Sequence, residues 1–224
     1  MALAVAAISP AASAPPAKTD LQSEELKGPV QSVSTGFIRK GETYQAMVSV
    51  ETFDRTGNLV ERKTNRVDFI KIDKPERKGA NTTIFHSIMG DTVQIYTFDA
   101  NGDIAEMAEH FGTKFTGPPD GVTRYKRDAN GRAIEEDFLG PGGKVGGLTI
   151  YTRDAAGNII SEEQALTGAK PPYPHTDFQY VFEAHGNWIK RTEKRSRYPA
   201  DTYFYGPEGT LLRTITYYGD DSKH

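Results

Sequence analysis

Aromatic and polar residues alternate along the chain in short segments that share one ending. In five segments a tyrosine lies three residues before an acidic residue or, in the last one, before a glycine; these are Tyr96, Tyr125, Tyr151, Tyr180 and Tyr203. Alternation places a second aromatic, such as Phe98 or Phe182, on the same face and polar residues such as Thr97 on the other. This period of two predicts half-buried β-strands.

Each predicted strand leads into a turn with a glycine at its fourth position. Five turns begin with an acidic residue and a sixth begins with glycine and proline; the pairs are Asp54 and Gly57, Asp99 and Gly102, Asp128 and Gly131, Asp154 and Gly157, Glu183 and Gly186, and Gly206 and Gly209. The carboxylate can accept a hydrogen bond from the N–H two residues on, and the glycine can adopt the left-handed conformation of a bulged type I turn. Because apolar residues follow each turn, every unit is predicted to be a β-hairpin.

These units predict an all-β domain. Four of the five gaps between turn glycines are 23 to 29 residues long, and the first, of 45, leaves room for strands at 67–72 and 82–89. Residues 30–38 and 44–52 flank a further turn at Gly41. We expect about twelve to sixteen short strands and no helix, in an antiparallel meander of repeated β-hairpins that forms a curved, spiralling or partly closed sheet.

The two ends of the chain differ from the repeat. Residues 1–14 are mostly Ala, Leu, Val and Ile and end in Ala-Ser-Ala, the pattern of a signal-peptidase site, so they are predicted to be a signal-peptide remnant. The positively charged segment that usually begins a signal peptide is missing. Either the true start of the protein lies further upstream, or residues 1–14 are simply an Ala-rich N-terminus. Residues 15–25 are predicted to be a linker, 26–219 a single β-hairpin repeat domain and 220–224 a polar tail. Export predicts a periplasmic or secreted protein, and no apolar stretch reaches the roughly 20 residues of a membrane-spanning helix.

The repeats resemble the YD repeats of bacterial Rhs-type proteins, toxin-complex shells, wall-associated proteins and teneurins. The best matches are RYKRDANGR at 124–132 and YTRDAAGN at 151–158, and the resemblance covers about residues 46–217. The resemblance implies hairpins laid side by side in a curved or spiralling sheet. The chain has fewer units than the shell-forming members, and the resemblance implies no catalytic residue.

Composition restricts the available chemistry. The chain has no cysteine, which excludes disulfides, thiolate nucleophiles and cysteine-based metal sites. Its net charge of -3 does not indicate a nucleic-acid partner. The five histidines lack the spacing of a local metal site, and residues 99–103 resemble a calcium loop that has Ile104 and His110 where glycine and glutamate are needed. No metal and no cofactor are predicted.

Acidic pairs on the predicted strands suggest one catalytic hypothesis. Two facing carboxylates, Glu136 and Glu163 from the runs at 135–137 and 162–163, could cleave a glycosidic bond. Alternation sends neighbouring residues to opposite faces, so a solvated strand explains such runs better. The glycine-rich segment 140–147 lacks the spacing of a phosphate-binding loop and is predicted to be a hairpin connection.

Cations and aromatic rings suggest binding. Five cations lie in 190–197 after Trp188, and strict alternation places Trp188 and Lys190 on one face and Arg191 on the other, which favours a solvated strand over a nucleic-acid surface. Arg127 and Arg153, beside the turns, are expected to keep their charged heads in water. Aromatic rings in repeats usually build the core, but they can also stack on sugars. The candidate ligand-binding residues are Tyr151, Tyr180, Trp188 and Tyr203.

The sequence therefore favours an exported, non-enzymatic β-repeat module that binds a protein or a polysaccharide at the bacterial cell envelope. Two alternatives remain open at this point. One is a carbohydrate-active enzyme that uses a carboxylate pair on the sheet, and the other is a toxin-neutralising protein.

Overall fold

The chain folds as a barrel of short antiparallel strands. The computed structural model describes residues 18–43, 47–66, 70–79, 81–86, 90–112, 117–168, 170–171, 173–196 and 208–219. Within these ranges the elements are α1 (Asp20–Ser23), β1 (Val30–Arg39), β2 (Met47–Phe53), β3 (Leu59–Arg66), β4 (Ile70–Lys78), β5 (Thr82–His86), β6 (Thr92–Phe98), β7 (Ile104–Phe111), β8 (Gly121–Arg127), β9 (Ala133–Leu139), the 3-10 helix η1 (Pro141–Gly143), β10 (Val145–Arg153), β11 (Ile159–Leu166), β12 (His175–Phe182), β13 (Trp188–Ser196) and β14 (Gly209–Tyr217).

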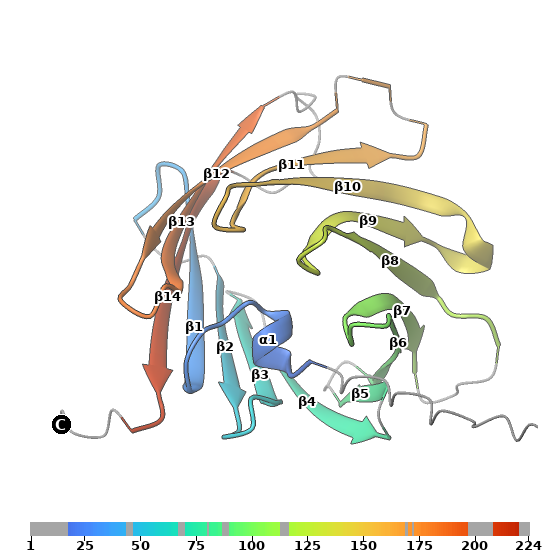
Figure 1. Ribbon diagram of the computed structural model, residues 1–224, viewed down its shortest axis with the longest axis horizontal. Helices are drawn as coiled ribbons and strands as arrows, with labels where there is room; N and C mark the ends of the chain where they lie inside the picture. The colour runs from blue at the N-terminus through green and yellow to red at the C-terminus, as the bar shows by residue number, and fades with distance from the viewer. Residues whose placement is uncertain are drawn as a thin grey trace, which may run out of the picture.

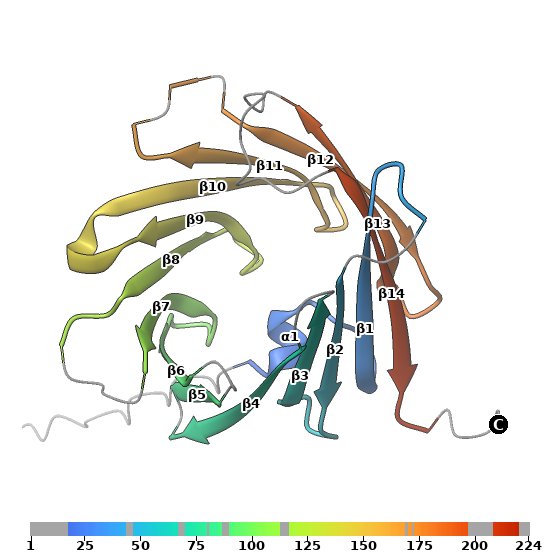
Figure 2. The same cartoon turned by 180° about the vertical axis from the view of Figure 1, so that it is seen from behind.

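Each strand pairs with the next in sequence, and the last strand pairs with the first. The pairing of β14 with β1 runs from Val30 opposite Tyr217 to Arg39 opposite Gly209 and closes the ring. Figures 1 and 2 show the strands arranged around α1. The predicted all-β antiparallel meander is confirmed. The sheet, for which the sequence left the degree of closure open, is a closed barrel, and closure gives both edge strands a partner.

Five acid-to-glycine turns lie on one rim of the barrel and share one geometry. In the turn at Asp128, the N–H of Gly131 donates to the Asp128 carbonyl at 3.0 Å, and the Asp128 carboxylate accepts from the N–H groups of Asn130 at 2.8 Å and Arg132 at 3.0 Å. The strand register shifts beside each of these turns, as in a bulged hairpin. The turn glycines have positive φ values: Gly57 88°, Gly102 79°, Gly131 76°, Gly157 98° and Gly186 82°.

Gly209, predicted to close a sixth turn, instead begins strand β14 and pairs with Arg39. A Cβ atom at this position would lie 2.5 Å from the Ile38 carbonyl oxygen and 2.5 Å from the Phe37 ring. The glycine therefore permits a close approach of β1 and β14. The other predicted members of this turn, Gly206 and Pro207, and the predicted signal-peptide remnant (1–14) and tail (220–224) lie outside the described residues.

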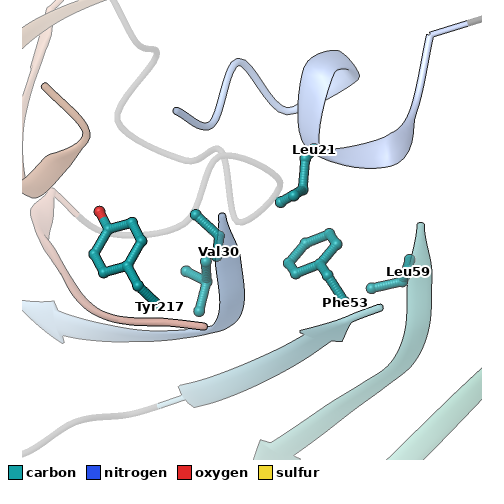
Figure 3. Packing of buried hydrophobic residues seen from close by; sticks show 6 residues of the cluster. Leu21, Val30, Phe53, Leu59 and Tyr217 are labelled. Atoms are coloured by element: carbon teal, nitrogen blue, oxygen red, sulfur yellow. The ribbon is translucent and has the colours of Figure 1, made fainter. Parts of the chain in front are cut away.

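The predicted linker over 15–25 is wrong for residues 18–25, because these residues are part of the folded barrel. Thr19 and Gln22 form a capping box in which Gln22 N–H donates to Thr19 Oγ1 at 3.3 Å and Thr19 N–H donates to Gln22 Oε1 at 2.9 Å. This cap starts α1, a helix that the sequence analysis did not expect. The helix points the buried side chain of Leu21 toward Phe53 (Figure 3).

The principal apolar core lies at the turn rim, beneath α1. Buried residues from α1, β1, β2, β3 and β14 form it; they are Leu21, Val30, Val33, Phe53, Leu59 and Tyr217. Figure 3 shows Tyr217 beside Val30 on the side of the cluster away from Leu59. Because the core gathers at one rim, the rest of the barrel interior is available for polar and aromatic side chains.

Strand alternation separates a face toward the lumen from an outer face. On the outer face, Arg124 Nε lies 2.7 Å from Glu106 Oε2 on the neighbouring strand, and Lys126 pairs with Glu135. Tyr125, between these two cations in the sequence, faces the lumen. In the part of the chain that the structure describes, no helix has the length and apolar character needed to cross a membrane.

Candidate ligand-binding lumen

A cavity of about 860 Å³ occupies the lumen between residues 18–27 and the inner face of β6 to β14. Its walls combine aromatic rings with charged groups; among the lining residues are Tyr125, Glu136, Tyr151, Tyr180, Trp188, Arg191 and Arg213. A second cavity of about 290 Å³ lies beside Glu136 and is also lined by Thr123, Phe138 and Thr149. A concave site that joins apolar rings to a few polar groups has the composition of a small-molecule site.

Tyrosines from alternate strands form one wall of the lumen. Tyr125, Tyr151 and Tyr180 occupy equivalent repeat positions in β8, β10 and β12, and the repeat therefore brings them to the same cavity. Burial raises the pKa of Tyr125 to about 12 and raises the pKa of Tyr151 further, with a contribution from Glu136. These phenols are therefore neutral hydrogen-bonding groups at physiological pH.

Of the four aromatic residues predicted to bind ligand, three line the cavity. Tyr151, Tyr180 and Trp188 lie together, and the Tyr180 ring centroid is 6.2 Å from that of Trp188. The Tyr180 hydroxyl donates to the Ile159 carbonyl at 2.7 Å, which fixes the ring. The fourth residue, Tyr203, lies outside the described residues.

A bulge brings Trp188 and Arg191 to the same face, contrary to the prediction from strict alternation. Phe182 pairs with Trp188 while Val181 pairs with Lys190, so one extra residue is inserted at the start of β13. The Arg191 guanidinium carbon then lies 5.5 Å from the Trp188 ring centroid, and that of Arg213 lies 3.6 Å from it. One ligand can therefore meet an aromatic ring and a cation here.

The acidic runs divide between the two faces as alternation requires. Glu136 lines the cavity. Glu162 on β11 lies opposite the lumen-facing Tyr151 on β10 and therefore faces the lumen as well. Glu163 is directed to the opposite face, where its Oε1 lies 3.4 Å from His175 Nδ1. Strand geometry therefore separates Glu136 from Glu163, and these two carboxylates cannot act as the facing pair of the catalytic hypothesis. Burial raises the pKa of both Glu136 and Glu162.

Residues 18–27 close the lumen at the turn rim by contacting successive hairpin turns. Lys18 N–H donates to the Gly102 carbonyl at 3.4 Å, and Leu21 N–H donates to the Gly57 carbonyl at 3.0 Å. At the last described turn, Lys27 N–H donates to Asn187 Oδ1 at 2.7 Å and the Lys27 carbonyl accepts from Asn187 Nδ2 at 2.9 Å. The repeated turns thus serve as docking points for this segment.

Arg153 lies beside the same rim. The prediction that its charged head lies in water is wrong, because the guanidinium is buried. Its side chain is only 7% exposed, and it donates to the carbonyls of Ala133 at 2.9 Å and Gly157 at 2.6 Å. Its Nη1 also lies 3.2 Å from Glu25 Oε1. Arg127 makes the equivalent bonds to the Ile104 and Gly131 carbonyls. These arginines hold neighbouring hairpins together.

The other sequence motifs have structural roles. Asp99 caps its own turn, accepting from the N–H groups of Asn101 at 2.8 Å and Asp103 at 3.0 Å, and Asp103 pairs with Lys18. The glycine-rich segment forms η1 between β9 and β10. Among the described residues, no group of three or more histidine, aspartate or glutamate side chains is placed to hold a metal ion.

Comparison with known proteins supports the fold. No family model and no curated protein matches the sequence. A porin-like protein from Bacteroides uniformis ATCC 8492 is similar in structure, with a TM-score of 0.50 and 10% identity over 85% of this chain and 99% of that chain. Crystal structures of TcdB2-TccC3-Cdc42 (TM-score 0.32, 15% identity, 67% of this chain and 8% of that one) and TcdB2-TccC3-TEV (TM-score 0.21, 10% identity, 75% and 15%) are more remote. At this level the first likeness indicates a shared fold alone.

Proposed function

We propose that this chain is an exported, non-enzymatic binding module of the bacterial cell envelope, and that its ligand is a carbohydrate that occupies the barrel lumen. The observation that carries the proposal is the cluster of Tyr125, Tyr151, Tyr180 and Trp188 on the wall of a cavity of about 860 Å³. Export and the envelope location rest on the composition of residues 1–14 and on the YD-like repeats.

The chemistry of the wall suits a sugar ring. The C–H faces of a pyranose pack against aromatic rings, and its hydroxyls need hydrogen-bonding partners at the ring edge. Tyr151 and Tyr180 supply faces, while Glu136 and Arg191 supply an acceptor and donors on the same cavity wall. The mixed wall therefore matches the two kinds of surface that a saccharide presents.

Closure of the barrel favours the lumen over an edge as the binding surface. A free sheet edge can recruit a partner by strand addition, but pairing of β1 with β14 gives each of these strands a neighbour on both sides. A protein ligand would then have to bind the outer face or the rims, where ion pairs such as Arg124–Glu106 already satisfy charged groups.

The single tryptophan makes the proposal testable by intrinsic fluorescence. Trisaccharides built from glucose, galactose, N-acetylglucosamine or galacturonic acid are titrated while Trp188 emission is recorded. At least one should change the emission saturably, and Tyr151→Ala and Tyr180→Ala should each weaken binding about tenfold. Phe111→Ala is the control, because Phe111 is 66% exposed and lies outside the cavity lining. No response to any trisaccharide, together with no retention on envelope polysaccharide, would refute a carbohydrate ligand.

A glycoside hydrolase remains a second candidate because Glu136 and Glu162 both face the lumen and burial raises the pKa of each. A carboxyl group with a raised pKa can act as a general acid toward a glycosidic oxygen. If the barrel hydrolyses mixed glycans, Glu136→Gln and Glu162→Gln should abolish turnover. Glu163→Gln, on the opposite face, should leave turnover unchanged and serves as the control.

A further inference from the structure

Arg213 is a lumen cation without an acidic partner in the described parts of the chain. It lies on β14, between Leu211 and Ile215 on the same face, and its guanidinium borders the main cavity. It makes no hydrogen bond and no ion pair with any residue that the structure describes, and its Nε is buried without a partner. Its guanidinium carbon lies over the Trp188 ring, 3.6 Å from the ring centroid.

The carboxylates near Arg213 lie closer to other cations, with which they form ion pairs. Glu51 lies 2.6 Å from Arg62 Nε, and Glu24 lies 4.0 Å from Arg62 Nη2. Glu193 lies 2.8 Å from Arg191 Nη2 and 3.2 Å from Arg195 Nη2.

Glu162 accepts a hydrogen bond from Gln164 Nε2 at 3.1 Å. Its pKa, like that of Glu24, is raised by burial, so neither carboxyl is strongly stabilised as an anion. The carboxylates around the cavity therefore do not neutralise Arg213 by direct contact.

A partly buried cation that no anion contacts directly is costly unless a ligand binds it. Desolvation lowers the pKa of Arg213, although Glu24 and Glu51 act in the opposite direction. Arg191 lies nearby on β13, and its Nε is also buried without a hydrogen-bond partner. Both guanidinium groups lie close to the Trp188 ring, so an oxyanion bound to the two of them would gain charge-assisted hydrogen bonds.

We propose that the lumen ligand carries a carboxylate, phosphate or sulfate group, and that this group binds Arg213 and Arg191 beside Trp188. The inference deepens the proposed carbohydrate function and rests on it for the rest of the ligand. The ligand is then an acidic saccharide. Its charged group meets the guanidinium edges, while a neighbouring sugar ring packs on Tyr180 and Tyr151.

The test compares two trisaccharides that differ only in having carboxylate or hydroxymethyl groups at C6. Trigalacturonic acid and its carboxyl-reduced counterpart, trigalactose, are titrated by isothermal calorimetry, with inorganic phosphate as a third probe. The acid should bind about tenfold to a hundredfold more tightly than the neutral sugar, and this preference should fall as salt rises. Arg213→Gln should abolish the preference. Arg132→Gln, which also borders the cavity but pairs with Asp128 at 2.9 Å, should keep it.

The possible results separate the two proposals. Equal affinity for acidic and neutral sugar, unchanged in Arg213→Gln, would overturn the anionic site and leave the carbohydrate function standing. Phosphate binding that Arg213→Gln removes, without binding of either sugar, would support the anionic site and refute the carbohydrate ligand. No binding by any probe would overturn both proposals. If Arg213→Gln does not fold, Arg213→Lys should still lose part of the preference, because lysine lacks the bidentate fork.

Discussion

Asn187 is predicted to be the strongest single link between the N-terminal segment and the repeats. Its side chain is buried, with the residue 3% exposed. It accepts from Lys27 N–H at 2.7 Å and donates to the Lys27 carbonyl at 2.9 Å and to the Tyr217 hydroxyl at 2.8 Å. Asn187→Ala removes these three bonds, and at about 1 kcal/mol each the free energy of unfolding should fall by about 3 kcal/mol.

Asn158 is the matched control because it follows Gly157 as Asn187 follows Gly186. Its side chain makes one local bond, from Nδ2 to Asp154 Oδ2 at 2.9 Å, so Asn158→Ala should cost only about 1 kcal/mol. The measurement is urea unfolding monitored by tryptophan fluorescence, with midpoints compared at a common slope. Hydrogen exchange of the Lys27 amide should accelerate in Asn187→Ala alone. Equal destabilisation by the two variants would refute the docking role of Asn187.

Three further predictions test the turns and the lumen. Gly131→Val should lower the free energy of unfolding in urea by about 2–3 kcal/mol, and Gly79→Val by about 1–2 kcal/mol. Both glycines have positive φ, but a Cβ at Gly131 would also lie 2.6 Å from Asp103 Oδ2. Equal losses in the two variants would contradict this reasoning. Desolvation acts to raise the pKa of Glu183, but hydrogen bonds from His185 and Asn187 outweigh it and lower the pKa to about 2 from 4.5. Its stabilisation is therefore present above pH 4.5 and lost as pH falls toward 2, and Glu183→Gln should flatten the pH dependence of stability in that window; an unchanged dependence would count against these bonds. Burial raises the pKa of Glu136, so ionisation of this carboxyl destabilises the folded state as pH rises. Glu136→Gln should therefore raise Tm at pH 7 more than at pH 3. A lower Tm of the variant at pH 7 would contradict this prediction.

The turns made the strand order predictable, because their signal is local. An acid that caps its own turn and a glycine at positive φ are interactions within five residues, as in the turn from Asp128 to Arg132. From these turns, alternation predicts the aromatic wall at Tyr151 and Tyr180. The helix at Asp20–Ser23 could also have been found, since Thr19 and Gln22 have the spacing of a capping box.

Other features depend on contacts that the sequence pattern does not display. A single inserted residue at the start of β13 reversed the face of Trp188 relative to Arg191, and strict alternation could not anticipate this bulge. Arg213 lies on an otherwise apolar face of β14, and this position was the only sign in the sequence that it faces the lumen. Barrel closure depends on the register of β1 against β14, which no local pattern fixes.

The junction of β1 with β14 also governs the order in which the molecule can assemble. Ser32 and Thr216, whose hydroxyl oxygens are 2.6 Å apart across it, are separated by 184 residues in sequence. Such non-local pairing slows folding, because the intervening chain must first be brought into place. A growing chain can complete its hairpins one after another, but its first strand keeps an unsatisfied edge until the last one has emerged. Premature termination would consequently leave an aggregation-prone intermediate rather than a smaller version of the native protein.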